Sequence, residues 1–171
     1  MELSDFNAVS SVCFTGHRDL NAEEEILITN KLKSLLTLLI EKKGLIRCYA
    51  GGAVGLDTVA AKTVLSLKTV YPQLELHLIL PCQRQDISWS EDQKAVYLLI
   101  KENADSVRIL APFYYNGCMQ ARNKALLESS DLCIAYLRPG TSSGGSLNTV
   151  LQATKLGIPV LNLADEESED I

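Results

Sequence analysis

The sequence contains no Cys-x-x-Cys pair, and its five cysteines are an odd number. Both features favour reduced thiols in a cytosol over a disulfide framework, so we expect a cytoplasmic protein. Cys13, Cys48 and Cys133 lie in apolar runs that resemble strands. In such runs cysteine acts as a small hydrophobic residue, and no metal site is predicted.

Long hydrophobic runs are also missing. The most apolar helical stretch, residues 32–40, contains Lys33 and is far too short to span a bilayer. The N-terminal residues include Glu2 and Asp5 without a long apolar run, so we expect no secretory signal. The sequence therefore predicts no membrane partner.

Clustered positive charge is a third absence. The formal net charge is −5, and the lysines and arginines are scattered along the 171 residues. Affinity for nucleic acid depends on clustered cations, and single-strand binding adds aromatic residues between them. No such run is present, which argues against a nucleic-acid partner.

Two common nucleotide-binding motifs are absent as well. Gly51, Gly52 and Gly55 have the spacing Gly-Gly-x-x-Gly, which differs from the Gly-x-Gly-x-x-Gly dinucleotide fingerprint. No Lys-Ser or Lys-Thr follows these glycines, so they do not form a P-loop. A standard ATPase mechanism is therefore not indicated.

What the sequence does contain is an alternation of apolar strand-like runs with helical patterns. Strands are expected over residues 9–15, 45–50, 74–80, 107–110, 132–137 and 159–163. The crossover lengths suit βαβ units. We predict an α/β fold with a doubly wound, mostly parallel Rossmann-like sheet of about six strands and helices on both faces. Residues 1–164 are expected to form a single domain, and 165–171 an acidic, disordered tail.

Two helix starts carry the pattern of a capping box. Asn21 is followed by Glu24, and Ser90 is followed by Gln93. In this arrangement the side chain of each residue accepts a hydrogen bond from the backbone N–H of the other, which satisfies two free N–H groups. Helices are therefore expected to begin after Asn21 and after Ser90.

Polar motifs follow the strands and should meet at one edge of the sheet. Ligands of such sheets bind outside the carboxyl ends of the strands, where the strand order reverses. If strands 9–15 and 107–110 are neighbours, these motifs converge on one pocket. The predicted ligand-binding residues are Gly16, His17, Arg18, Gly51, Gly52, Gly55, Asp57, Arg122, Asn123, Gly144, Gly145 and Ser146.

Each motif has a functional and an ordinary interpretation. Gly144, Gly145 and Ser146 open a helix, whose free N–H groups and partial positive charge suit phosphate. Arg18 could offer a forked donor to the same group or lie solvated in a loop. Arg122 with Asn123 is either an anion clamp or part of a solvated helix face. Their occurrence together favours a functional pocket.

These motifs, with Pro81 and Trp89 between them, resemble the YpsA-like proteins of the wider DprA/LOG-like (SLOG) superfamily of Rossmann-like domains. The resemblance covers residues 9–163. It implies binding or sensing of a nucleotide or a nucleotide-derived ligand, such as an ADP-ribose-like molecule. The phosphates would lie on the two glycine turns, with charge from Arg18 and Arg122. Asp57 would accept a ribose hydroxyl or complement its own helix dipole.

The resemblance to the SLOG superfamily implies two alternative functions. LOG phosphoribohydrolases cleave the base–ribose bond of nucleoside monophosphates with a carboxylate, but here Gly144 or Thr149 would occupy that place. Neither can act as a general base, so no catalytic residue is predicted. DprA proteins handle single-stranded DNA, which the net charge of −5 disfavours. The resemblance is also compatible with a homodimer.

Overall fold

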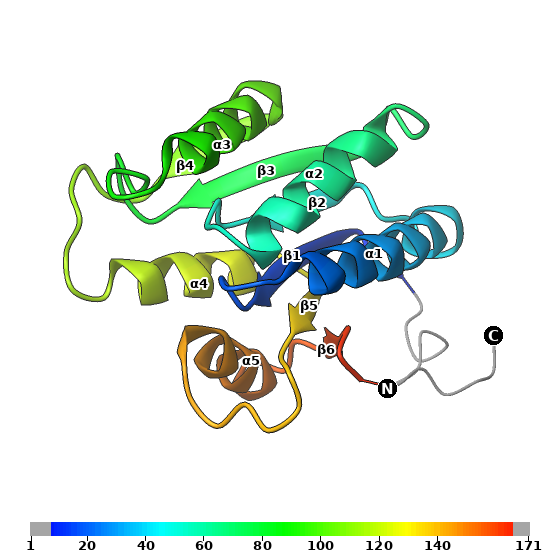
Figure 1. The fold of residues 1–171 in the computed structure, drawn as a ribbon. Helices are drawn as coiled ribbons and strands as arrows, with labels where there is room; N and C mark the ends of the chain where they lie inside the picture. The colour runs from blue at the N-terminus through cyan, green and yellow to red at the C-terminus, as the bar shows by residue number, and fades with distance from the viewer. Residues whose placement is uncertain (1–7, 166–171) are drawn as a thin grey trace.

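The computed structural model describes residues 8–165 and shows a six-stranded sheet between two layers of helices (Figure 1). The strands are β1 (Ser11–Gly16), β2 (Arg47–Ala50), β3 (Glu75–Leu80), β4 (Ser106–Ile109), β5 (Leu132–Tyr136) and β6 (Val160–Asn162). The helices are α1 (Ala22–Lys43), α2 (Leu56–Lys68), α3 (Glu91–Asn103), α4 (Cys118–Glu128) and α5 (Gly145–Lys155). Every strand pair is parallel, which confirms the predicted Rossmann-like α/β fold.

The two faces of the sheet are covered by different helices. The first face packs against α1, α2 and α3 through a large core that includes Phe14, Leu36 and Leu78. The second face packs against α4 and α5 through a smaller cluster that includes Cys13 and Leu126. Because side chains alternate along a strand, β1 serves both cores from neighbouring residues.

The strand order is β4-β3-β2-β1-β5-β6, and it corrects the expectation that strands 9–15 and 107–110 are neighbours. β4 lies at the edge of the sheet and pairs with β3, whereas β1 lies between β2 and β5. All four β4 residues are exposed, while all five β5 residues are buried, so burial favours β5 for the central place. The order reverses between β1 and β5, which leaves a crevice at their carboxyl ends.

Both predicted capping boxes are confirmed. Asn21 Oδ1 accepts the Glu24 N–H over 2.9 Å, and the Glu24 carboxylate accepts the Asn21 N–H over 2.9 Å. Ser90 and Gln93 make the same reciprocal pair. Helices α2, α4 and α5 differ, because each begins after a glycine that offers no side-chain cap.

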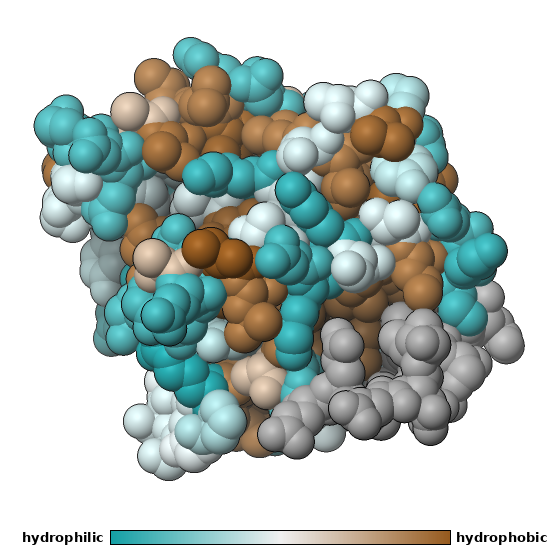
Figure 2. Space-filling model, turned by 45° about the vertical axis from the view of Figure 1, so that its right-hand side comes forward, coloured by the Kyte–Doolittle hydropathy of each residue, from teal (hydrophilic) through white to brown (hydrophobic). Residues whose placement is uncertain are grey.

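Hydrophilic and hydrophobic residues are intermixed on the face shown in Figure 2. Between residues 8 and 165, no helix is both long and apolar enough to cross a membrane. All five cysteines are free and buried. The tail predicted over 165–171 lies, apart from Asp165, outside the described residues.

Candidate ligand-binding site

A cavity of about 290 Å³ lies at the point where the strand order reverses. Its walls come from the end of β1, the turn after β2, one side of α4 and the loop that opens α5. The predicted residues that line it are Gly16, His17, Arg18, Asp57, Arg122, Asn123, Gly144, Gly145 and Ser146. Four motifs that are distant in the sequence thus meet at one cavity.

The start of α5 presents backbone donors to this cavity. The first intrahelical bond runs from Asn148 N to Gly144 O over 3.0 Å. The N–H groups of residues 145–147 precede that bond, and nothing between residues 8 and 165 accepts from them. A Cβ placed on Gly144 or Gly145 would meet no atom within 4 Å, so this backbone is open to an approaching ligand.

Ser146 holds the same helix against β1. Its hydroxyl donates to the Gly16 carbonyl oxygen over 2.7 Å. A Cβ on Gly16 would lie 2.4 Å from Leu56 Cδ2, so this glycine lets α2 pack closely on the end of β1. The Ser146 side chain therefore positions the α5 start rather than offering its proton to the cavity.

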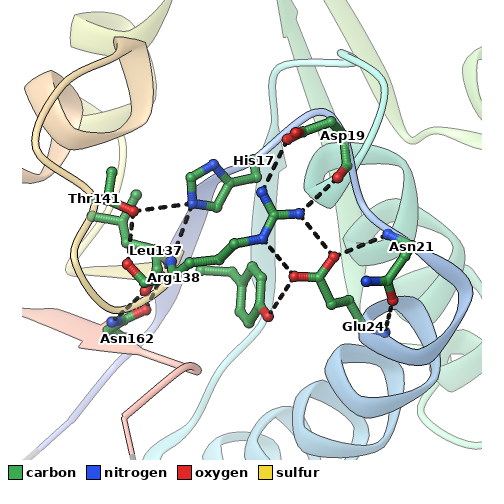
Figure 3. Close-up of polar contacts among 9 residues, drawn as sticks. His17, Asp19, Asn21, Glu24, Leu137, Arg138, Thr141 and Asn162 are labelled. Atoms are coloured by element: carbon green, nitrogen blue, oxygen red, sulfur yellow. Dashed lines mark hydrogen bonds and ion pairs between the residues drawn. The ribbon is translucent and has the colours of Figure 1, made fainter.

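The ring of His17 has a defined orientation. Nε2 accepts the backbone N–H of Arg138 over 3.1 Å, so the neutral ring carries its proton on Nδ1. Thr141 Oγ1 lies 3.4 Å from Nε2 and donates to the Arg138 carbonyl oxygen over 2.7 Å. Figure 3 shows Nδ1 on the ring edge that faces away from these two residues. Nδ1 has no hydrogen-bond partner among the described residues and is left as a donor.

Arg138 ties the loop after β5 to the start of α1 (Figure 3). Its guanidinium donates to both Glu24 carboxylate oxygens, over 2.6 and 2.8 Å, and to the Asp19 carbonyl oxygen over 2.7 Å. The Arg138 hydrogen bond, with the Asn21 N–H, lowers the pKa of Glu24 to about 2. This network fixes the loop that carries the His17 partner and leads into α5.

Arg122 is turned away from solvent and is engaged on three sides. Its side chain donates from Nη1 to Gly51 O over 2.6 Å and from Nε to Asn123 Oδ1 over 2.7 Å. Nη1 also lies 3.6 Å from Asp57 Oδ2. The residue is only 4% exposed, so it reaches the cavity edge as a structural group.

Asp57 is the acidic partner of this buried pair. Its Oδ2 atom accepts the Ala53 N–H over 3.1 Å, which stabilises the turn before α2. Burial raises the pKa of the Asp57 carboxyl, and the Arg122 guanidinium opposes that shift. Two roles were considered for Asp57, namely accepting a ribose hydroxyl and complementing the dipole of its own helix. Its contacts lie at its own helix start.

A chain of hydrogen bonds continues from Arg122 to α5. Asn123 Nδ2 donates to Thr149 Oγ1 over 2.8 Å, and Thr149 Oγ1 donates to Gly145 O over 2.9 Å. Helices α2, α4 and α5 are therefore joined beside the cavity. Thr149, one of the two positions considered for a hydrolase carboxylate, is buried and fully engaged.

Arg18 contrasts with Arg122. It is exposed, and its one hydrogen bond among the described residues is a long contact of 3.9 Å from Nη2 to Met119 Sδ. A thioether is a weak acceptor, so most of the guanidinium donors remain available. Arg18 is thus the cation that a ligand in this cavity can use.

Three predicted glycines do not line the cavity. Gly51 leaves room for Arg122, whose Nη1 would lie 1.9 Å from an added Cβ. Gly55 has a φ of 79°, and an added Cβ would lie 2.3 Å from the His17 carbonyl oxygen. Gly52 packs against Leu80 and Gln85 in the same way. These glycines shape the turn behind the site.

A model of the YspA SLOG family matches residues 12–155. The match includes all four motifs and every helix and strand from the second residue of β1 to the end of α5. The chain belongs to the YspA SLOG family.

Curated relatives of this SLOG-family protein include UPF0398 proteins. It is 34% identical over 107 residues to one from Brevibacillus brevis. The aligned region covers 61% of this chain and 56% of that protein. It is 28% identical over 130 residues to another from Bacillus thuringiensis, with 75% and 69% of the two chains covered. The match thus spans little more than half of the Brevibacillus brevis protein.

Among solved structures, DNA processing protein A from Helicobacter pylori has a similar fold. The TM-score is 0.62 at 20% sequence identity, and the match covers 97% of this chain and 69% of that one. That protein is described by its single-stranded DNA binding mode. The likeness supports the Rossmann-like fold of this SLOG-family protein.

Sequence reasoning left several cavity-lining residues and one organiser of the site out of the predicted set. Thr15, Met119 and Thr141 line the cavity, and Arg138 anchors its loop. Thr15 had a usable signal, since it directly precedes Gly16, His17 and Arg18. In the part of the chain that the structure describes, no group of three or more His, Cys, Asp or Glu could hold a metal ion.

Proposed function

We propose that this SLOG-family protein binds a phosphate-bearing ligand of the nucleotide type in the cavity between β1, α4 and α5. The observation that carries the proposal is the start of α5, where the N–H groups of residues 145–147 have no acceptor among the described residues. The exposed Arg18 lines the same cavity. A helix N-terminus carries a partial positive charge and directed donors, both of which suit phosphate.

The surrounding side chains complete an anion site. Arg18 supplies a full positive charge and a planar fork of donors. The Nδ1–H of His17 supplies a neutral donor from the β1 side. Small-molecule pockets usually measure about 300–1,000 Å³. At about 290 Å³ the cavity suits a mononucleotide, or one phosphate-bearing end of a larger ligand such as ADP-ribose.

The acidic side chains at the cavity are more consistent with ligand binding alone than with hydrolysis of the ligand. Among the described residues that line the cavity, Asp57 is the one acidic side chain, and it is 7% exposed and held by Ala53 N and Arg122. Glu128 lies outside the cavity and pairs with Lys124. A glycosidic bond needs an acid and a carboxylate at the scissile centre. The phosphoribohydrolase alternative therefore has less support.

A second candidate function is binding of single-stranded DNA. The specific observation is a run of exposed aromatics after β4, with Phe113 78%, Tyr114 69% and Tyr115 48% exposed. Stacking of bases on aromatic rings contributes about 1–3 kcal/mol per base. The DNA-binding protein with a similar fold adds to this reading, while the net charge of −5 opposes it. Anisotropy of a labelled oligothymidylate at several salt concentrations tests it directly.

Thermal unfolding with a ligand series tests the primary proposal. Inorganic phosphate, ribose 5-phosphate, AMP and ADP-ribose should each raise the melting temperature, and adenosine should not. Ligand at 100 times its dissociation constant adds about 2.7 kcal/mol, which is readily detected. An Arg108→Ala variant, changed at an exposed arginine of the β4 edge, serves as the matched control and should respond like the wild type. Stabilisation by adenosine equal to that by AMP would refute the phosphate site.

A further inference from the structure

Thr15 stands at the carboxyl end of β1 and lines the cavity while being only 7% exposed. Along a strand its side chain shares a face with Cys13, which belongs to the core under α4 and α5. Its hydroxyl makes no hydrogen bond to any group between residues 8 and 165. All fully enclosed side-chain nitrogen and oxygen atoms in that range have a partner. The Thr15 hydroxyl is therefore not fully enclosed, and it opens into the cavity.

Comparison with the other buried polar residues sets Thr15 apart. Thr63 donates to Val59 O over 2.8 Å, and Thr149 bonds Asn123 and Gly145. Ser11, Asp57 and Arg122 are likewise engaged. Polar side chains in buried places are usually hydrogen-bonded. A residue that offers such a hydroxyl to a cavity points to a partner outside the chain.

The surroundings define what that partner is. Of the two arginines that line the cavity, Arg122 is already bonded to Gly51 and Asn123, and Leu126 contributes an apolar wall. A phosphate would be poorly neutralised here, whereas Arg18 and the α5 start can receive it elsewhere in the cavity. A neutral hydroxyl both donates and accepts, and suits another hydroxyl.

We propose that Thr15 hydrogen-bonds a hydroxyl of a phosphorylated sugar whose phosphate lies on the start of α5. The inference rests on the proposed function and deepens it, because it names the sugar as the part of the ligand that contacts the end of β1. Thr15 is then the residue that distinguishes a sugar phosphate from phosphate alone.

Thr15→Val is the sharpest test, because valine keeps the shape and removes only the hydroxyl. The unliganded variant should melt at the wild-type temperature or above it, since no hydrogen bond within the described chain is lost. Calorimetric titration should show affinity for ribose 5-phosphate reduced about 2- to 12-fold, the equivalent of one neutral hydrogen bond. Affinity for inorganic phosphate should be unchanged.

Two variants complete the experiment. Thr15→Ser should restore the preference for ribose 5-phosphate, and Thr63→Val, at a buried threonine outside the cavity, should leave both affinities at wild-type values. An unchanged ribose 5-phosphate affinity in Thr15→Val, or an equal loss for both ligands, would overturn the role of Thr15 while leaving the phosphate site standing. Failure of the wild type to bind either ligand would instead remove the phosphate site, and this inference with it.

Discussion

The guanidinium of Arg122 lies across the backbone of Gly51, and its Nη1 atom donates to the Gly51 carbonyl oxygen over 2.6 Å. The side chain occupies the space that a Cβ on residue 51 would need. The two residues therefore depend on each other, although 71 positions separate them in the chain. This contact holds Arg122 at the wall of the cavity and leaves Arg18 as the cavity arginine with open donors.

The two arginines should respond differently to truncation. Arg18→Ala should weaken binding of AMP by about 1.5–3 kcal/mol, the range for a hydrogen bond to a charged group, without changing stability. Arg122→Ala should destabilise the fold by about 3–5 kcal/mol, because it leaves the buried Asp57 carboxylate unpaired. Urea titrations and calorimetry of both variants separate the effects. Unchanged stability in Arg122→Ala would contradict the buried pair.

Two glycines should also behave oppositely when replaced by alanine. Gly51→Ala should destabilise the protein by about 1–3 kcal/mol or more, because the new methyl group collides with Arg122. Gly145→Ala meets open space and should leave stability unchanged or raise it by up to about 1 kcal/mol. The Gly145 variant should nevertheless bind AMP more weakly, because the methyl group would project into the space proposed for the phosphate. Full affinity in this variant would place the ligand elsewhere.

The Glu24–Arg138 network should make stability depend on pH in the acidic range. The pKa of Glu24 in the folded protein is about 2, below its ordinary value of 4.5. A depressed carboxyl pKa stabilises the fold above the unfolded value and loses that contribution as pH falls toward the folded value. Glu24→Gln should therefore be less stable than the wild type at pH 7, with a difference that shrinks between pH 5 and pH 2. A difference that is constant over this range in chemical denaturation would refute the assignment.

Nucleoside monophosphates should remain intact in the presence of the protein. Among the described cavity residues Asp57 is the one carboxylate, and it is held by Ala53 and Arg122. Chromatography of AMP and other monophosphates after long incubation should show no free base above a protein-free control. Base release that is lost in a folded Asp57→Asn variant would instead make Asp57 a catalytic residue.

Local signals in the sequence were sufficient for the helices and strands of the fold, but not for the strand order. The capping boxes at Asn21 and Ser90 depend on residues three positions apart, so the sequence alone could predict them. The meeting of four motifs at one edge followed from the rule that parallel strands end together. The predicted neighbour of β1, the strand at 107–110, was wrong, because pairing of distant strands depends on burial of whole strands rather than on local pattern.

The detail of the site was less accessible from the sequence. Arg122 and Arg18 are the same residue type in similar motifs, yet one is 4% exposed and the other lies open. The difference arises from Gly51 and Asp57, which approach Arg122 from other parts of the chain. The sequence could not predict the unpartnered hydroxyl of Thr15 either, since most buried polar side chains are hydrogen-bonded.

The uncapped start of α5 has a kinetic consequence. It lies at the cavity and adds about half a positive charge to that of Arg18. The chain as a whole carries a formal charge of −5. An anionic ligand is thus repelled by most of the surface and attracted at this entrance. Its association rate should fall as added salt shortens the reach of that field, while its dissociation rate changes far less.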